Sequence, residues 1–220
     1  MAAERAEALL DEMESKSRAG DFTLRPNTRT FNAAILAWRN SNTTDAPLRA
    51  EALLKRMNEK YKAGDQQCRP DRVTLNTIID VWAKSSQPQA PERAAEFLKF
   101  MESLYRKGDR SFRPDEYTFN SCIDAYGRRG DGPGAQSLFE RMQVLARTDP
   151  LLQPGIITLT ALQGAWNRSP QTRESLEHLA TIQSMIVEQN RASRKNVLDS
   201  EEQIAQLSAL DALSGKDVLE

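Results

Sequence analysis

The sequence predicts an all-α protein, a right-handed superhelical solenoid of antiparallel helix pairs. The first observation behind this prediction is a repeat, because residues of four types recur at a fixed interval of 44 residues. The second is composition, since helix-forming residues dominate and only 6% of residues are aromatic. The recurring residues are Arg5, Arg49 and Arg93; Met13, Met57 and Met101; Gly20, Gly64 and Gly108; and Pro26, Pro70 and Pro114.

Each unit opens on a proline turn, written RPNTRTFN, RPDRVTLN, RPDEYTFN or QPGIITLT. Proline ends the preceding element, and the Thr or Asn that follows can cap a new helix. Phe31, Ile35 and Trp38 are spaced by four and three, which is one apolar stripe of a helix. We therefore predict a first helix per unit, helix A, at Thr30–Asn40, Thr74–Lys84, Thr118–Arg128 and Thr158–Arg168.

A polar link leads to a second helix, helix B, whose core is RAEALLKRM at Arg49–Met57. Three further copies stand at Arg5–Met13, Arg93–Met101 and Gly134–Met142. Glycine follows helix B in the first three units, where we predict left-handed caps. The residues between this glycine and the next proline (GDFTLR, GDQQCR, GDRSFR) are predicted to be surface insertions.

These patterns divide the chain into a partial repeat (1–25), repeats at 26–69, 70–113 and 114–153, a degenerate repeat (154–190) and a final segment (191–220). The partial repeat holds helix B and an exit loop without helix A, so we expect the chain to be a fragment of a longer protein. Within the final segment we predict a linker at Arg191–Ser200, a capping helix at Glu201–Leu213 and an acidic tail.

Composition argues against several classes of protein. No apolar run approaches the ~20 residues of a membrane span, and the acidic N-terminus shows neither a signal peptide nor a transit peptide. Cys68 and Cys122 are predicted to be free thiols. The single histidine, His178, assembles no metal site or catalytic triad and is predicted to lie on a helix surface. We therefore predict no catalytic residue, metal, cofactor, membrane contact or small-molecule substrate.

Two strings point to a family: VTLNTIIDVWAK at Val73–Lys84 and YTFNSCIDAYGR at Tyr117–Arg128, each followed by helix B. With a closing Pro-Asp after the first, they resemble pentatricopeptide repeats over roughly residues 1–190. The units are longer than is usual for the family. The fourth unit departs further, with Thr160 where the others carry Asn. This resemblance implies binding of single-stranded RNA, one base per repeat.

The resemblance also assigns roles to single residues. It places base-reading residues near the start of helix A and at the residue that closes the family's own unit, which here directly follows the proline of the next turn. In this family, pairing Asn with Asp favours uracil. The pairs are Asn32 with Asp71, Asn76 with Asp115, and Asn120 with Gly155, the last giving no base. Base-stacking side chains are Arg29, Val73, Tyr117 and Ile157.

Eight residues after the reading position, or after Thr160 in the fourth unit, stand Asn40, Lys84, Arg128 and Arg168. Three of these four, Lys84, Arg128 and Arg168, are cations that can contact phosphates. Each feature also has a structural interpretation. An Asn at a helix start is often a cap, and a terminal cation complements the helix dipole. The net charge of −1 does not by itself indicate a nucleic-acid binder.

Three functions therefore stay open. The first is an RNA-binding adaptor that acts in processing, stability or translation of transcripts in a mitochondrion or plastid, alongside other RNA-processing proteins. The second is a tetratricopeptide-like scaffold that binds a protein segment in the same groove. The third is a fragment of a larger enzyme whose catalytic domain lies outside these residues.

Overall fold

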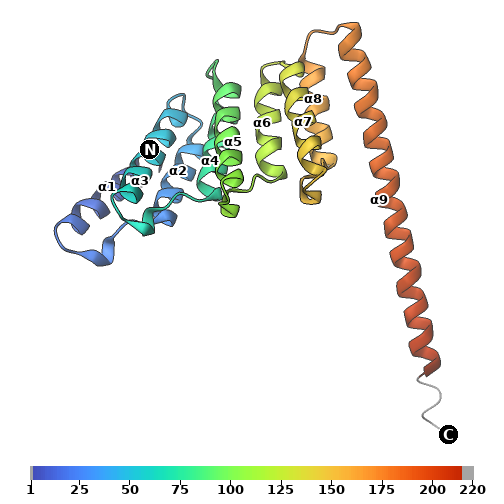
Figure 1. The fold of residues 1–220 in the computed structure, drawn as a ribbon, viewed down its shortest axis with the longest axis horizontal. Helices are drawn as coiled ribbons and strands as arrows, with labels where there is room; N and C mark the ends of the chain where they lie inside the picture. Colours follow the sequence, from blue (N-terminus) through green and yellow to red (C-terminus); the bar gives the residue numbers. More distant parts are fainter. Residues whose placement is uncertain (1, 215–220) are drawn as a thin grey trace.

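The computed structural model describes the backbone of residues 2–214 and the side chains of residues 2–195, and the regular secondary structure of this part of the chain is all helical. Helix pairs stand side by side along the molecule, and a long last helix extends beyond them (Figure 1). The A helices are α2 (Thr28–Ser41), α4 (Arg72–Lys84), α6 (Glu116–Arg128) and α8 (Ile156–Arg168). The B helices are α1 (Ala2–Arg18), α3 (Ala46–Lys62), α5 (Ala90–Arg106) and α7 (Gly132–Ala146), and α9 spans Arg173–Ser214.

Each helix A begins two residues before its predicted start because the residue after the proline, and not the threonine, is the N-cap. Asn27, Asp71 and Asp115 accept hydrogen bonds from the backbone of the third helical residue. That residue is a threonine whose hydroxyl closes the bond network around the cap, forming a capping box. The threonines of the repeat are therefore inside the helix and belong to its cap.

The glycines after helix B adopt the predicted left-handed conformation, with φ of +104° at Gly20 and +99° at Gly64 and Gly108. At Gly64 the backbone N–H bonds to the carbonyl of Tyr61 at 3.0 Å, and that of Asp65 bonds to Lys60 at 3.0 Å. This pair of bonds is a Schellman motif, which satisfies carbonyls left free at a helix end. Glycine is required because a side chain strains a left-handed backbone.

The exit loops are more than surface insertions, and this prediction was incomplete. Each loop forms a short 3₁₀ turn, η1 (Phe22–Leu24), η2 (Gln66–Cys68), η3 (Arg110–Phe112) and η4 (Pro150–Leu152). The last residue of η2, η3 and η4 is buried. Ion pairs also link consecutive loops: Arg25 to Asp65 at 3.0 Å, Arg69 to Asp109, and Arg113 to Asp149. The insertions therefore tie neighbouring repeats together.

The two helix layers pack differently. Each helix A packs directly against the next helix A, whereas consecutive B helices make few such contacts and lie farther apart. Long side chains span the B layer instead, as in the ion pairs of Arg56 with Glu14 at 2.8 Å and Arg93 with Glu51 at 2.6 Å. An array with one close layer and one open layer bends toward the close layer, so the A helices line the inner side. The right-handed sense of the superhelix stays a prediction.

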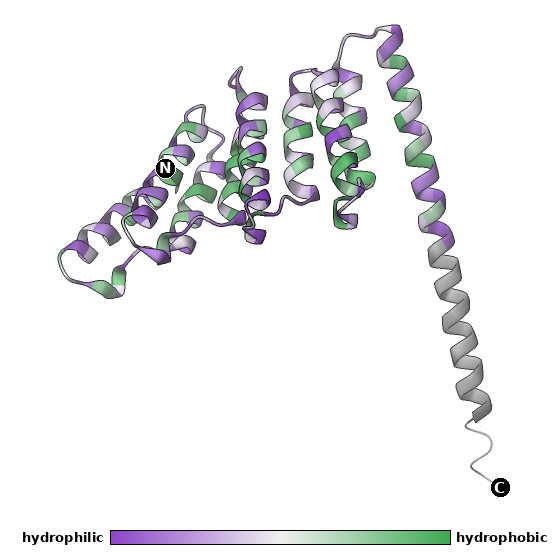
Figure 2. Ribbon diagram, viewed as in Figure 1, coloured by the Kyte–Doolittle hydropathy of each residue, from purple (hydrophilic) through white to green (hydrophobic). Residues whose placement is uncertain are grey.

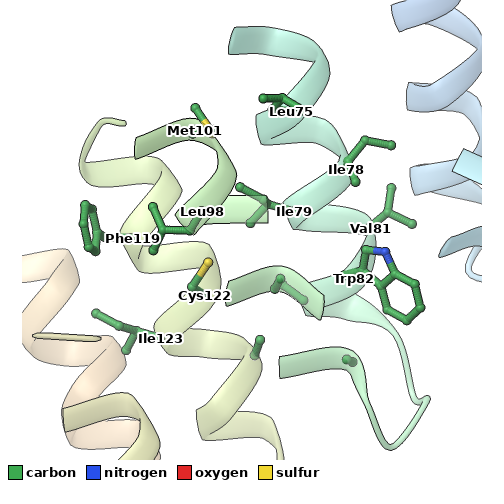
Figure 3. Close-up of a cluster of buried hydrophobic side chains, with 14 of the residues drawn as sticks. Leu75, Ile78, Ile79, Val81, Trp82, Leu98, Met101, Phe119, Cys122 and Ile123 are labelled. Carbon is green, nitrogen blue, oxygen red and sulfur yellow. The ribbon is translucent and has the colours of Figure 1, made fainter. Parts of the chain in front are cut away.

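A continuous apolar core runs between the layers, and apolar and polar residues are interspersed along each repeat helix (Figure 2). Figure 3 shows part of it, where Ile79 of α4 points toward Leu98 of α5, and Phe119 of α6 lies on the other side of Leu98. The stripe residues Phe31, Ile35 and Trp38 of α2, with their counterparts Leu75, Ile79 and Trp82, are buried as predicted. Each tryptophan keeps its indole N–H satisfied: Trp82 Nε1 donates to Glu51 at 2.6 Å.

Two predictions about the last helix were wrong. Arg191–Ser200 is not a linker but part of α9, since the segment contains no glycine or proline to interrupt a helix. His178 is not a free surface residue; its ring stacks on Trp166 with centroids 4.3 Å apart. Ile182, one helical turn after His178, is buried in the core. The covering role predicted for Glu201–Leu213 depends on side chains outside the described residues, as does the acidic tail at 215–220.

Candidate nucleic-acid interface

The second residue of every helix A is exposed. Val73 is 58%, Tyr117 50% and Ile157 68% exposed, and Arg29 is exposed at the same register. A single exposed apolar side chain is unremarkable, but three in register on consecutive helices form a row on one face. We call these four residues, which are the predicted stacking residues, the exposed row.

The first predicted reading pair is in contact although its members are 39 residues apart. Asn32 Nδ2 donates to Asp71 Oδ1 at 3.2 Å, and Asn32 Oδ1 accepts from the Thr74 hydroxyl at 2.7 Å. Asp71 Oδ1 also accepts from the backbone N–H of Thr74 at 2.8 Å, which is its capping bond. The cap thus fixes the carboxylate, and carboxylate and threonine together orient the amide.

The second pair shares its threonine in the same way. The Thr118 hydroxyl donates to Asn76 Oδ1 at 2.9 Å and lies 2.8 Å from Asp115 Oδ1. Asp115 caps α6, and Arg72 Nη1 lies 3.5 Å from its second oxygen. The sequence places Asn76 and Asp115 together correctly, but it gave no indication of Arg72 or of the bridging hydroxyl.

The third pair differs because Gly155 has no side chain and makes no side-chain cap. The Thr158 hydroxyl donates to Glu116 Oε1 at 3.1 Å. Asn120 Oδ1 is buried and has no hydrogen-bond partner among the described residues. Sequence reasoning missed Glu116; the available signal was an acid beside Asp115 in the one unit that closes on glycine.

Hollows lie between the last three members of the exposed row, Val73, Tyr117 and Ile157. One of about 210 Å³ is bounded by Val73 and Tyr117 and includes Asn76. The next, of about 410 Å³, is bounded by Tyr117 and Ile157 and includes Asn120. In both, an apolar or aromatic side chain stands on each side of a predicted reading residue, which is the geometry that a flat heteroaromatic ring fits.

The predicted phosphate-binding cations already have partners. Lys84 Nζ lies 3.0 Å from Asp80 Oδ2, and Arg128 Nε lies 2.7 Å from Asp124 Oδ2. Arg168 Nε donates to the carbonyl of Gly127 at 2.8 Å. A phosphate at these positions therefore competes with a carboxylate for Lys84 and Arg128.

Asp80 is the most buried acid of this face, at 6% exposure, and lies in the wall of both hollows. It accepts hydrogen bonds from Arg39, one repeat earlier, and from Lys84. Burial raises the pKa of the neighbouring Tyr117 hydroxyl, the charge of Asp80 raises it further, and Arg39 lowers it. Tyr117 is therefore neutral at physiological pH. The sequence assigned no role to Asp80 or to Arg39.

Other features of the described residues bear on chemistry. Cys68 and Cys122 are buried free thiols, as predicted, and burial raises the pKa of Cys68 to about 11. In the part of the chain that the structure describes, no three His, Cys, Asp or Glu side chains are grouped so that they can hold a metal ion. No helix in that part has the length and apolar character to cross a membrane.

Residues 117–145 match the sequence model of the PPR repeat. The matched segment runs from the second residue of α6 to the last turn of α7, which is one A–B helix pair. It contains Tyr117, Asn120 and Arg128, which are residues of the candidate interface. No curated protein matched the chain.

Proposed function

Because this chain belongs to the pentatricopeptide repeat (PPR) family, whose members are generally RNA binders without enzymatic activity, we propose that its A-helix face binds single-stranded RNA. Each base enters between two members of the exposed row and meets the asparagine between them. The protein acts in organellar RNA processing, stability or translation by holding a transcript, and not by chemical conversion.

The observation that carries the proposal is the alternation of exposed side chains and hollows. Val73, Tyr117 and Ile157 stand in register with a hollow in each interval. Each interval contains a reading asparagine from the helix A that supplies its first wall. Stacking on an exposed side chain is sequence-tolerant, while an amide at the base edge discriminates donors from acceptors.

At the first two sites the asparagine and aspartate together suit uracil. Uracil presents one N–H between two carbonyls on its Watson–Crick edge. An amide N–H of Asn32 or Asn76 can donate to a uracil carbonyl, and the carboxylate of Asp71 or Asp115 can accept from its N–H, directly or through water. Two adjacent uracils are therefore the proposed target of these repeats.

Phosphate binding at Lys84 and Arg128 needs no new cation, only a shift of the existing pairs. Each ammonium or guanidinium group has more donors than its carboxylate uses, so a phosphate can join the pair. The paired carboxylate nevertheless lowers the binding free energy that each phosphate contact contributes. Two or three stacked bases worth roughly 1–3 kcal/mol each sum to about 2–9 kcal/mol, so we expect dissociation constants between tens of millimolar and just below about one micromolar.

Fluorescence anisotropy of the full chain with labelled single-stranded RNA tests the proposal. An adenine-rich RNA containing two adjacent uracils should bind more tightly than the same RNA without them. Asn76→Ser should alter the base preference, whereas Asn58→Ser, on helix α3 of the outer layer, should leave it unchanged. If none of these RNAs binds even at low salt, the proposal fails, and a protein-binding scaffold becomes the better interpretation.

A further inference from the structure

The third base site has a carboxylate that does not come from the expected residue. At the first two sites the acid closes the unit, as Asp71 or Asp115, but Gly155 stands at this position in the third. Glu116 Oε1 lies 2.7 Å from the point that a Cβ of Gly155 would occupy. The backbone of Gly155 is extended, with φ of −93°, so any residue fits its conformation. The three atoms from elsewhere in the chain that lie nearest to that point all belong to the Glu116 side chain.

The position of Glu116 recurs in the other repeats. The first residue of each helix A reaches the end of its own unit: the Thr28 hydroxyl bonds to the carbonyl of Arg69 at 2.6 Å, and Arg72 lies 3.5 Å from Asp115. At the second site this residue is the cation Arg72, which partly neutralises the charge of the reading aspartate, Asp115. At the third it is an acid that stands where the reading acid is missing.

The reading amide of the third site is also held differently. Thr74 and Thr118 donate to Asn32 and Asn76, which fixes those amides. Thr158 donates to Glu116 instead, and Asn120 Oδ1 is left buried without a partner among the described residues. Because Thr158 does not hold the amide of Asn120, this amide can turn and present its N–H donors to a ligand.

We propose that Glu116 is a specificity-determining residue and that the hollow between Tyr117 and Ile157 takes guanine; this inference rests on the proposed RNA binding. Guanine alone among the standard bases has two adjacent donors, N1–H and N2–H, on its Watson–Crick edge, and a carboxylate accepts both. Asn120 Nδ2 then donates to guanine O6. The hollow, at about 410 Å³ against about 210 Å³ for the preceding one, has room for a purine.

The test uses the full chain and labelled adenine-rich RNAs in which two uracils are followed, or in a second set preceded, by A, C, G or U. The guanine RNA of one set should bind about fivefold more tightly than the other three, as expected for a bidentate contact. Glu116→Gln keeps an acceptor for Thr158 but removes the charge and one acceptor. It should reduce the guanine preference below about twofold and leave the dependence on the two uracils intact.

A gain of specificity provides the converse test. Glu116→Thr combined with Gly155→Asp clears the space beside residue 155 and recreates the Asn–Asp pair of the first sites, with a threonine where Thr28 stands at the first. This double variant should shift the third position from guanine to uracil. Glu140→Gln, on the outer helix α7, is the matched control and should change nothing. Thermal unfolding confirms that each variant is folded.

Two results distinguish a failure of the guanine site from a failure of the proposed RNA binding. If the chain binds the uracil-containing RNAs but does not favour guanine, or if folded Glu116→Gln retains the preference, the guanine site is wrong and RNA binding stands. If no RNA of either set binds, both are wrong.

Discussion

Asp71 can separate a structural role from an RNA-reading role, because two substitutions remove different things. Asp71→Ala removes both the cap of α4 and the acceptor for Asn32. Asp71→Asn keeps an oxygen for the backbone N–H of Thr74, which Asp71 binds at 2.8 Å, but loses the negative charge and one acceptor.

The magnitudes follow from the bonds that are lost. Replacing an N-cap aspartate by alanine costs about 1 kcal/mol. The part-buried bond from Asn32 Nδ2 at 3.2 Å adds about 0.5–1.5 kcal/mol. Asp71→Ala should therefore lower the free energy of unfolding by about 1.5–2.5 kcal/mol. Since asparagine caps as well as aspartate, Asp71→Asn should lower it by only a few tenths of a kcal/mol.

Urea unfolding followed by circular dichroism measures the stability, and anisotropy with the two-uracil RNA and its adenine and cytosine analogues measures base preference. We expect Asp71→Asn to be nearly as stable as the parent chain but to lose part of its uracil preference. An unchanged preference in this variant would show that the carboxylate only caps the helix. If Asp71→Ala unfolds at the same urea concentration as the parent, the capping argument itself is refuted.

Other substitutions test the repeat and its interface. Gly64→Ala should lower the free energy of unfolding by about 1–2 kcal/mol through its left-handed backbone, whereas Gly164→Ala, inside α8, should not destabilise; equal effects in urea unfolding would contradict this. Lys84→Ala with Arg128→Ala should weaken binding to all RNAs and reduce the salt slope by about 0.7 per lost phosphate contact; an unchanged slope in anisotropy would rule out these contacts. The buried Cys68 thiol, with its pKa raised from 9.0 to about 11, contributes stability that is complete below pH 9 and lost as pH rises through about 11. The parent should therefore lose stability relative to Cys68→Ala over this range in urea unfolding, and a constant difference would be inconsistent with a buried neutral thiol.

The repeat architecture was predictable because its signals are local and redundant. Glycine at a left-handed position, proline before a cap and the spacing of Phe31, Ile35 and Trp38 each specify one event in the backbone, and the 44-residue register repeats them. The helix starts were misplaced by two residues because Thr30 and its counterparts belong to a capping box inside the helix. The exit loops were underestimated because the Arg25–Asp65 pair joins different repeats.

The candidate site was predictable only in part, because part of it consists of contacts between residues of different repeats. The exposed row and the Asn32–Asp71 contact follow from register. The roles of Arg39 and Glu116 depend on which side chains face one another across a repeat boundary, and sequence spacing does not specify this. The sequence gives the positions of the cations but not the carboxylates that hold them.

The double use of the closing residue limits which bases such an array can come to recognise. Asp71 and Asp115 each cap the next helix, so the residues tolerated there are those that cap well: Asp, Asn, Ser, Thr and Gly. A substitution to any residue outside this set lowers the stability of the following helix by about 1 kcal/mol. Asn32 and Asn76 lie inside their helices and cap no helix. Redesign of the array, and its divergence over time, should therefore vary the asparagine position freely and the closing position only within the capping set.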